Sequence, residues 1–172
     1  RITMNQTGET KTNLPPWEPY SYERLLQLMA GNVDAVQFLL DIARMSHVYD
    51  DLIDKDKAVP DDAIHDVFWT LLISMPRNPF FARHQDELRP VLITAILNWR
   101  AANEMQKSAQ KEELRVAHVL RYSPADLIHL CMVLTGGVAH SIKHARTAAL
   151  IGRADTWANY LAEATEQRNT SC

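Results

Sequence analysis

Two aspartates, Asp50 and Asp54, lie on the apolar side of the helix that the sequence predicts for residues 33–54. When this segment is wound at about 3.6 residues per turn, most of its apolar side chains form one broad arc that includes both carboxylates. His47 lies beside them, and Asp51 lies at the edge of the arc. A buried carboxylate without a partner is costly, so such groups are usually paired, protonated or bound to a cation. This segment is therefore the first candidate for a functional site.

These carboxylates have the chemistry of a magnesium site. Asp50 and Asp54 are one helical turn apart, so their side chains can reach the same point. Neighbouring carboxylates repel each other unless a cation neutralises them, and their hard oxygens suit Mg²⁺, which is often shared with substrate phosphates. Asp51 can add a third oxygen, and Glu104 is the best carboxylate from a second helix, one predicted to be largely buried. We therefore expect Mg²⁺ as the cofactor and a diphosphate-containing small molecule as the substrate.

Four further side chains are candidates for substrate binding. His47, one turn before Asp50, could orient a carboxylate or a water molecule. Lys55 and Lys57 follow the acidic segment directly, and Arg100 is a cation on a later helix, so all three could contact phosphate oxygens. Arg100 can equally form an ordinary ion pair along its own helix.

The segment 49–54 resembles the first aspartate-rich motif, Asp-Asp-x-x-Asp, of the trans-prenyl synthases and other class I isoprenoid synthases. In that family the motif lies near the end of a core helix of an all-α enzyme and binds Mg²⁺ with an allylic diphosphate. The resemblance implies that Asp50 and Asp54 bind the metal directly and that Asp51 contributes from further out. It covers about ten residues. The family's arginine pair, second Asp-Asp-x-x-Asp and greater length are absent.

A second metal motif is a further expectation, on the last predicted helix. Asp155, Asn159 and Glu163 follow one another at intervals of four residues. This spacing resembles the Asn-x-x-x-Ser-x-x-x-Glu metal motif of terpene cyclases, with Asp and Asn in the first two places. Three polar residues on one helical stripe suit either a second metal site or a solvated face.

The elements that must position these residues are predicted to be helical throughout. Long helical periods dominate, and no alternating strand pattern stands out. Residues 1–19 are expected to form an extended or disordered arm, and residues 20–172 a single-domain all-α bundle of about seven or eight helices. The resemblance implies an isoprenoid-synthase-like arrangement. Pro90 is expected to kink a helix or to begin a new one. The expected helices cover 22–29, 33–54, 62–75, 79–108, 111–122, 124–135, 138–151 and 154–167.

Composition narrows the functional classes. A chain of 172 residues, 47% of them hydrophobic, fits one domain with a sizeable core. A net charge of −3 with mixed signs gives no strong nucleic-acid signal. No apolar run is long enough to predict a membrane span, and the two cysteines do not form a disulfide framework. We therefore expect a cytoplasmic protein.

Three functions are compatible with this sequence. The first is a Mg²⁺-dependent, isoprenoid-synthase-like enzyme acting on a diphosphate. The second is an all-α nucleotide pyrophosphohydrolase, which also pairs carboxylates on bundle helices. The third is a non-catalytic helical bundle, a homo-oligomer or adaptor module, in which Asp50 and Asp54 belong to a structural network with Arg100, His129 or a lysine. The sequence alone does not choose among them.

Overall fold

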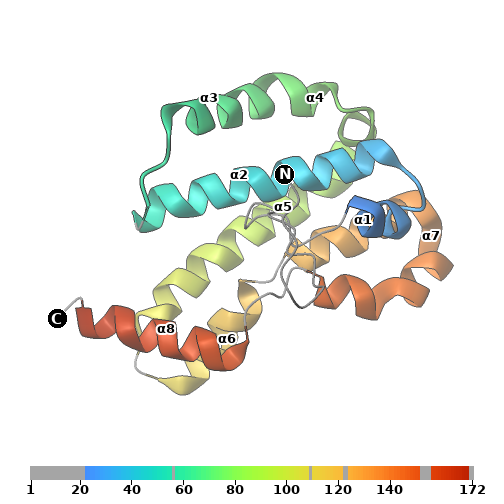
Figure 1. The fold of residues 1–172 in the computed structure, drawn as a ribbon. Helices are drawn as coiled ribbons and strands as arrows, with labels where there is room; N and C mark the ends of the chain where they lie inside the picture. Colours follow the sequence, from blue (N-terminus) through green and yellow to red (C-terminus); the bar gives the residue numbers. More distant parts are fainter. Residues whose placement is uncertain (1–21, 56, 109, 122–123, 152–155, 171–172) are drawn as a thin grey trace, which may run out of the picture.

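The computed structural model describes residues 22–55, 57–108, 110–121, 124–151 and 156–170. Within these ranges the chain forms helices and no strands, so the all-α class is confirmed. The arm predicted for residues 1–19 lies outside the described residues. The helices, seen in Figure 1, are α1 (Tyr22–Leu28), α2 (Val33–Asp54), α3 (Asp61–Trp69), the π-helix η1 (Thr70–Ser74), α4 (Met75–Arg77), α5 (Pro79–Gln106), α6 (Lys111–Leu120), α7 (Pro124–Leu150) and α8 (Trp157–Thr170).

Local signals in the sequence set several helix ends. The side chain of Asn32 caps α2 by accepting a hydrogen bond from the backbone N–H of Ala35 at 2.9 Å. Asn78 caps α5 in the same way through the N–H of Phe81 at 3.0 Å, and Pro79 occupies the first turn. Lys55 ends α2 in the left-handed region, with φ of 57°. These boundaries match the expected ones because short-range capping chemistry determines them.

Six of the labelled α-helices in the described ranges contain nine residues or more, fewer than the seven or eight helices expected. The difference arises because residues 124–135 and 138–151, expected as two helices, belong to the single helix α7, and because α1 has seven residues. Pro90 does not interrupt α5. The break in helical geometry falls instead at His84, with φ of −118° and ψ of 17°. The expectation for Pro90 was therefore wrong. A proline inside a helix removes one hydrogen bond, and here the helix continues past that loss.

A glycine folds α7 back on itself. Gly137 has φ of 76° and ψ of 176°, a conformation essentially restricted to glycine. Figure 1 shows the two halves of α7 lying beside each other in the orange part of the chain. By length and composition alone, one helical stretch of the described chain, 111–150, contains a segment apolar enough to cross a membrane. In this structure the bend at Gly137 and the boundary between α6 and α7 divide that stretch into short pieces.

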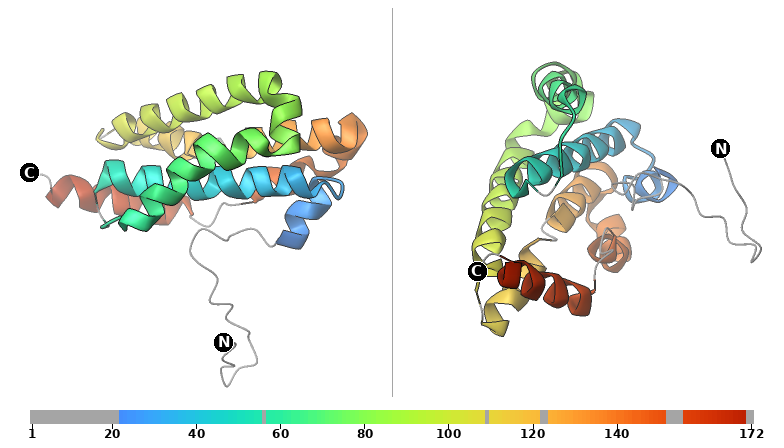
Figure 2. Two further views of the ribbon diagram at one scale, coloured as in Figure 1. Left: turned by 90° about the horizontal axis from the view of Figure 1, so that it is seen from above. Right: turned by 60° about the vertical axis from the view of Figure 1, so that its left-hand side comes forward.

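Two hydrophobic cores hold the helices together. The larger core combines buried residues of α1, the first half of α2, α4, the first part of α5 and α7, centred on side chains such as Phe38, Leu88 and Met132. The smaller core joins the end of α5 to α6 and α8 through Leu114, Tyr160 and their neighbours. The long helix α5 belongs to both cores. Figure 2 shows α3, η1 and α4 as an outer layer that packs on one side of α2, away from α8.

Candidate functional site

The acidic end of α2 lies beyond the larger core. All the fully buried side chains of α2 fall between Ala35 and Met45. After that point the apolar residues of the predicted arc are open to solvent: Tyr49 is 43% exposed and Ile53 is 51% exposed. The expectation that this half of the arc faces a closed interior was therefore wrong. The periodicity was right, but beyond Met45 the described helices cover this side of α2 only in part, through contacts with Trp99 of α5.

Asp50 has a specific partner on α5. Its Oδ1 accepts a hydrogen bond from the indole Nε1–H of Trp99 at 2.8 Å, and both residues are half-buried. The ring of Tyr49 lies against the ring of Trp99, with centroids 5.0 Å apart. The carboxylate and the aromatic pair together attach the end of α2 to the middle of α5. This contact fixes one helix to another and leaves Asp50 partly open to water.

The other predicted metal ligands of this segment point to different surroundings. An Asp51 oxygen lies 3.6 Å from the Lys57 ammonium in an ion pair whose lysine side chain is 71% exposed. Asp54 and His47 are exposed. Lys55 serves as the left-handed residue that ends the helix. In the structure Asp50 therefore has Trp99 as its hydrogen-bond partner, and Asp51 has Lys57 as its ion-pair partner.

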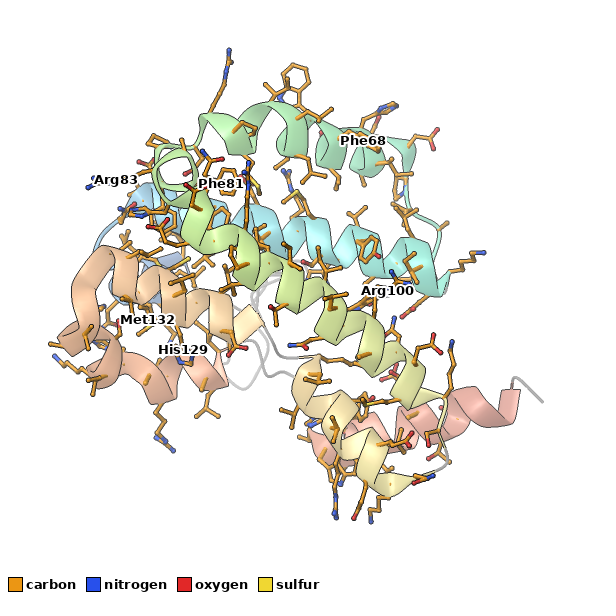
Figure 3. All side chains as sticks on the ribbon, turned by 180° about the vertical axis from the view of Figure 1, so that it is seen from behind. Phe68, Phe81, Arg83, Arg100, His129 and Met132 are labelled. Carbon is orange, nitrogen blue, oxygen red and sulfur yellow. The ribbon has the colours of Figure 1, made fainter. Side chains whose placement is uncertain are left out.

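Glu104 and Arg100 do not complete a site with Asp50. Glu104 is exposed, contrary to the expectation of a largely buried position, and its carboxylate accepts a 2.8 Å hydrogen bond from Lys107 one turn later. That hydrogen bond and the charge of Lys107 lower the pKa of Glu104, with a smaller contribution from Arg100. Figure 3 shows Arg100 on α5, far from His129, whose ring nitrogen contacts the carbonyl oxygen of Ala145 at 3.1 Å.

The proposed second metal motif on α8 faces outward where it is described. Asn159 and Glu163 are exposed, whereas Tyr160 and Ala164 on the other side of the helix are buried in the smaller core. Asp155 lies outside the described residues. This arrangement is the solvated face that the sequence left open as the alternative to a metal site.

No cluster of three or more His, Cys, Asp or Glu side chains with metal-binding geometry occurs among the described residues. Mg²⁺ and diphosphate binding therefore stay predictions that the geometry does not support. The residue that sequence reasoning missed is Trp99, the actual partner of Asp50. A tryptophan in a polar stretch of a predicted helix, next to the chosen Arg100, was a usable signal, because a buried indole N–H needs an acceptor.

A polar groove of about 450 Å³ lies on the opposite half of α2, between this helix, η1 and α4. Arg44 crosses it: its Nη2 donates to the hydroxyl of Thr70 at 2.5 Å and lies 3.6 Å from a carboxylate oxygen of Asp41. Asn78 adds a hydrogen bond to the carbonyl oxygen of Asp34 at 2.9 Å. The polar groups of the groove thus join α2 to η1 and α5, and the groove contains no predicted site residue.

A strongly exposed apolar surface of the described chain, which sequence reasoning did not single out, is the outer face of the rod formed by α3 and η1. We define this outer face by Phe68, Trp69, Leu72 and Ile73. The first three are 61%, 65% and 68% exposed, and Ile73 is 38% exposed. Figure 3 shows Phe68 on α3, in the outer layer that lies beyond α2.

The opposite side of the same rod is also apolar. Met75 is buried in the larger core, Val67 packs against that core, and Thr70 is buried where Arg44 reaches it. Residues four apart lie on the same side of a helix, which places Phe68 with Leu72 and Trp69 with Ile73. The helix therefore has one apolar side that is covered and another that is not.

The comparisons with known proteins add no family to this geometry. The acidic segment resembles one short motif, and what surrounds that segment here is an indole, a lysine and solvent. No protein-family model, curated protein sequence or solved structure matches this chain.

Proposed function

We propose that this chain is a non-catalytic helical module that associates with another protein surface through the outer face of the α3–η1 rod. One observation carries the proposal: a helix that is apolar on both sides has only one of them covered by the residues that the structure describes. Helices that are apolar all round are normally buried on all sides. The side chains of the outer face would then be buried by a partner.

The size of the outer face supports this reading. With aromatic side chains of about 150–250 Å² each, its four residues expose roughly 450 Å² of apolar side-chain area. That value lies in the middle of the range of about 300–600 Å² for the largest apolar patch on a monomer, and such patches are often functional. A standard interface buries about 800 Å² per partner, about 56–65% of it apolar, so it needs roughly 450–520 Å² of apolar area. The outer face supplies the lower figure.

The acidic segment fits a structural role in such a module. Asp50 holds α2 against α5 through Trp99, and Asp51 pairs with a lysine in the turn that follows α2. Both contacts connect elements whose packing determines where the α3–η1 rod lies. Neither contact needs a cation or a substrate.

A matched pair of variants tests the proposal. Phe68→Ser with Leu72→Ser makes the outer face polar, and Val138→Ser with Ile142→Ser does the same to α7 residues that are 64% and 73% exposed. Native mass spectrometry of each affinity-purified protein measures the assemblies that it forms. We expect the first variant to lose its assemblies and the second to keep them. The melting temperature should be unchanged in both variants when it is measured at a concentration too low for assembly, because association itself stabilises the folded protein. Equal assembly in both variants, or a melting temperature of the monomer lowered only in the first, would count against the proposal.

A further inference from the structure

We propose that the partner is a second copy of this chain, with the two α3–η1–α4 rods packed antiparallel about a two-fold axis. This inference rests on the proposed function, because it assigns an occupant to the same outer face. Closed two-fold dimers are the commonest soluble assemblies, and their interface must be complementary to itself. The charges along this rod meet that requirement.

The two ends of the rod carry opposite charges. Asp61 and Asp62 begin α3, Arg77 ends α4, and all three are exposed. The midpoint between positions 62 and 77 falls between Trp69 and Thr70, within the most apolar part of the rod. Antiparallel pairing centred there places Asp62 of one copy opposite Arg77 of the other, and the symmetry produces the same pair twice. Parallel pairing would place like charges side by side.

The apolar residues fit the same axis. An antiparallel arrangement brings the two Trp69 side chains together near the two-fold axis and packs Leu72 of each copy against Phe68 of the other. On the helical wheel, His65 and Pro76 extend the outer face toward its two ends. No lysine, arginine, aspartate or glutamate lies between positions 67 and 76, so the centre of the interface contains no formal charge that must be desolvated.

The pairing can be separated from ordinary helix electrostatics by charge reversal. Acidic residues at the start of a helix and basic residues at its end also stabilise that helix through its own dipole. Asp62→Lys alone or Arg77→Glu alone would worsen the dipole and also place like charges opposite each other in the dimer. The double variant worsens the dipole at both ends but restores opposite charges across the interface. Recovery in the double variant can therefore come only from contacts between copies.

Sedimentation velocity over about 1–200 µM measures the dissociation constant of the dimer for each protein. We expect each single reversal to weaken the dimer about tenfold or more, and the double variant to return to within about threefold of wild type. A double variant weaker than both single variants would refute the antiparallel pairing. Melting temperatures of the monomers, measured at low concentration, verify that every variant is folded.

Cross-linking tests the direction independently. In a Cys172→Ser background, Asp62→Cys mixed with Arg77→Cys is expected to give a disulfide-linked product under mild oxidation, and neither variant alone should do so. Cross-links within Asp62→Cys alone would indicate parallel rods and refute the model.

The two proposals can fail separately. If the wild type stays monomeric at 200 µM, the second copy is the wrong occupant. The proposed function would then stand only if Phe68→Ser with Leu72→Ser still removes a different partner in the native mass spectra. If the α3–η1 variants change no assembly of any kind, both proposals are wrong.

Discussion

Replacing Asp50 with alanine tests whether the acidic segment is structural. The change removes the acceptor of the Trp99 indole N–H, which donates at 2.8 Å. A hydrogen bond to a charged group contributes roughly 1.5–3 kcal/mol when both partners are buried. Asp50 and Trp99 are only half-buried, so water can replace part of the interaction. We therefore expect Asp50→Ala to lower the free energy of unfolding by about 1 kcal/mol, or the melting temperature by about 2–4 °C for a chain of this size.

A double-mutant cycle isolates the contact itself. Trp99→Phe removes the donor and keeps a ring beside Tyr49, whose centroid lies 5.0 Å from that of Trp99. Urea unfolding of wild type, Asp50→Ala, Trp99→Phe and the double variant should give a coupling energy of about 0.5–1.5 kcal/mol. Asp51→Ala is the matched control, because its ion pair with Lys57 is exposed, and it should change stability by about 0.5 kcal/mol or less.

Two results would refute this reasoning. A coupling energy near zero would mean that the indole and the carboxylate do not stabilise each other. A stabilising effect of Asp50→Ala would mean that the fold holds this carboxylate at a cost, which is the usual property of a ligand-binding group. The second result would support the predicted cation site at the end of α2.

Three further predictions address other parts of the molecule. Mg²⁺ with inorganic diphosphate should leave the melting temperature unchanged, and a rise that Asp50→Ala with Asp54→Ala abolishes would revive the magnesium site. Burial raises the pKa of Cys131 to about 12, so the folded protein keeps this thiol neutral while the unfolded chain ionises near 9. The contribution of this thiol to the free energy of unfolding should therefore be constant below pH 9 and fall by about 1.4 kcal/mol per pH unit above pH 9. Urea unfolding at pH 8.5 and 10.5 measures this loss, which should be absent from Cys131→Ala. Gly137→Ala should cost about 1–3 kcal/mol in the same assay, because φ of 76° with ψ of 176° strains any side chain, and an unchanged midpoint would contradict the strain argument.

The sequence predicted those parts of the fold that short-range chemistry determines. Asn32 and Asn78 both serve as the expected caps, and the expected break at Gly137 reverses the direction of α7. The proline prediction was wrong because the cost of Pro90 in a long helix depends on how the rest of α5 packs. Its two ends belong to different hydrophobic cores, which hold α5 as one continuous element.

The candidate site was predicted less well, for a reason that applies to any helical wheel. A wheel gives the direction of each side chain around its axis, but not the length over which a neighbouring helix covers that side. On α2 the last fully buried residue is Met45, so the carboxylates further along lie on the right side of the helix without sharing a cavity. The indole of Trp99, 49 positions away in the sequence, contacts Asp50, and nothing in the local pattern specifies such a pairing.

A helical wheel also does not show which side of the α3–η1 rod is covered by other helices, and here the difference from the structure points to a partner. Apolar residues on both sides of a helix predict burial on both sides, and the described part of the chain covers only the side that includes Val67 and Met75. On α2 the exposed apolar residues are interspersed with carboxylates and a histidine, and water can form hydrogen bonds with these polar groups. On the outer face the exposed residues Phe68, Trp69, Leu72 and Ile73 are all apolar, so their exposure to water is unfavourable. The difference between these two uncovered surfaces is the physical reason to expect a partner at α3–η1 and not at the acidic end of α2.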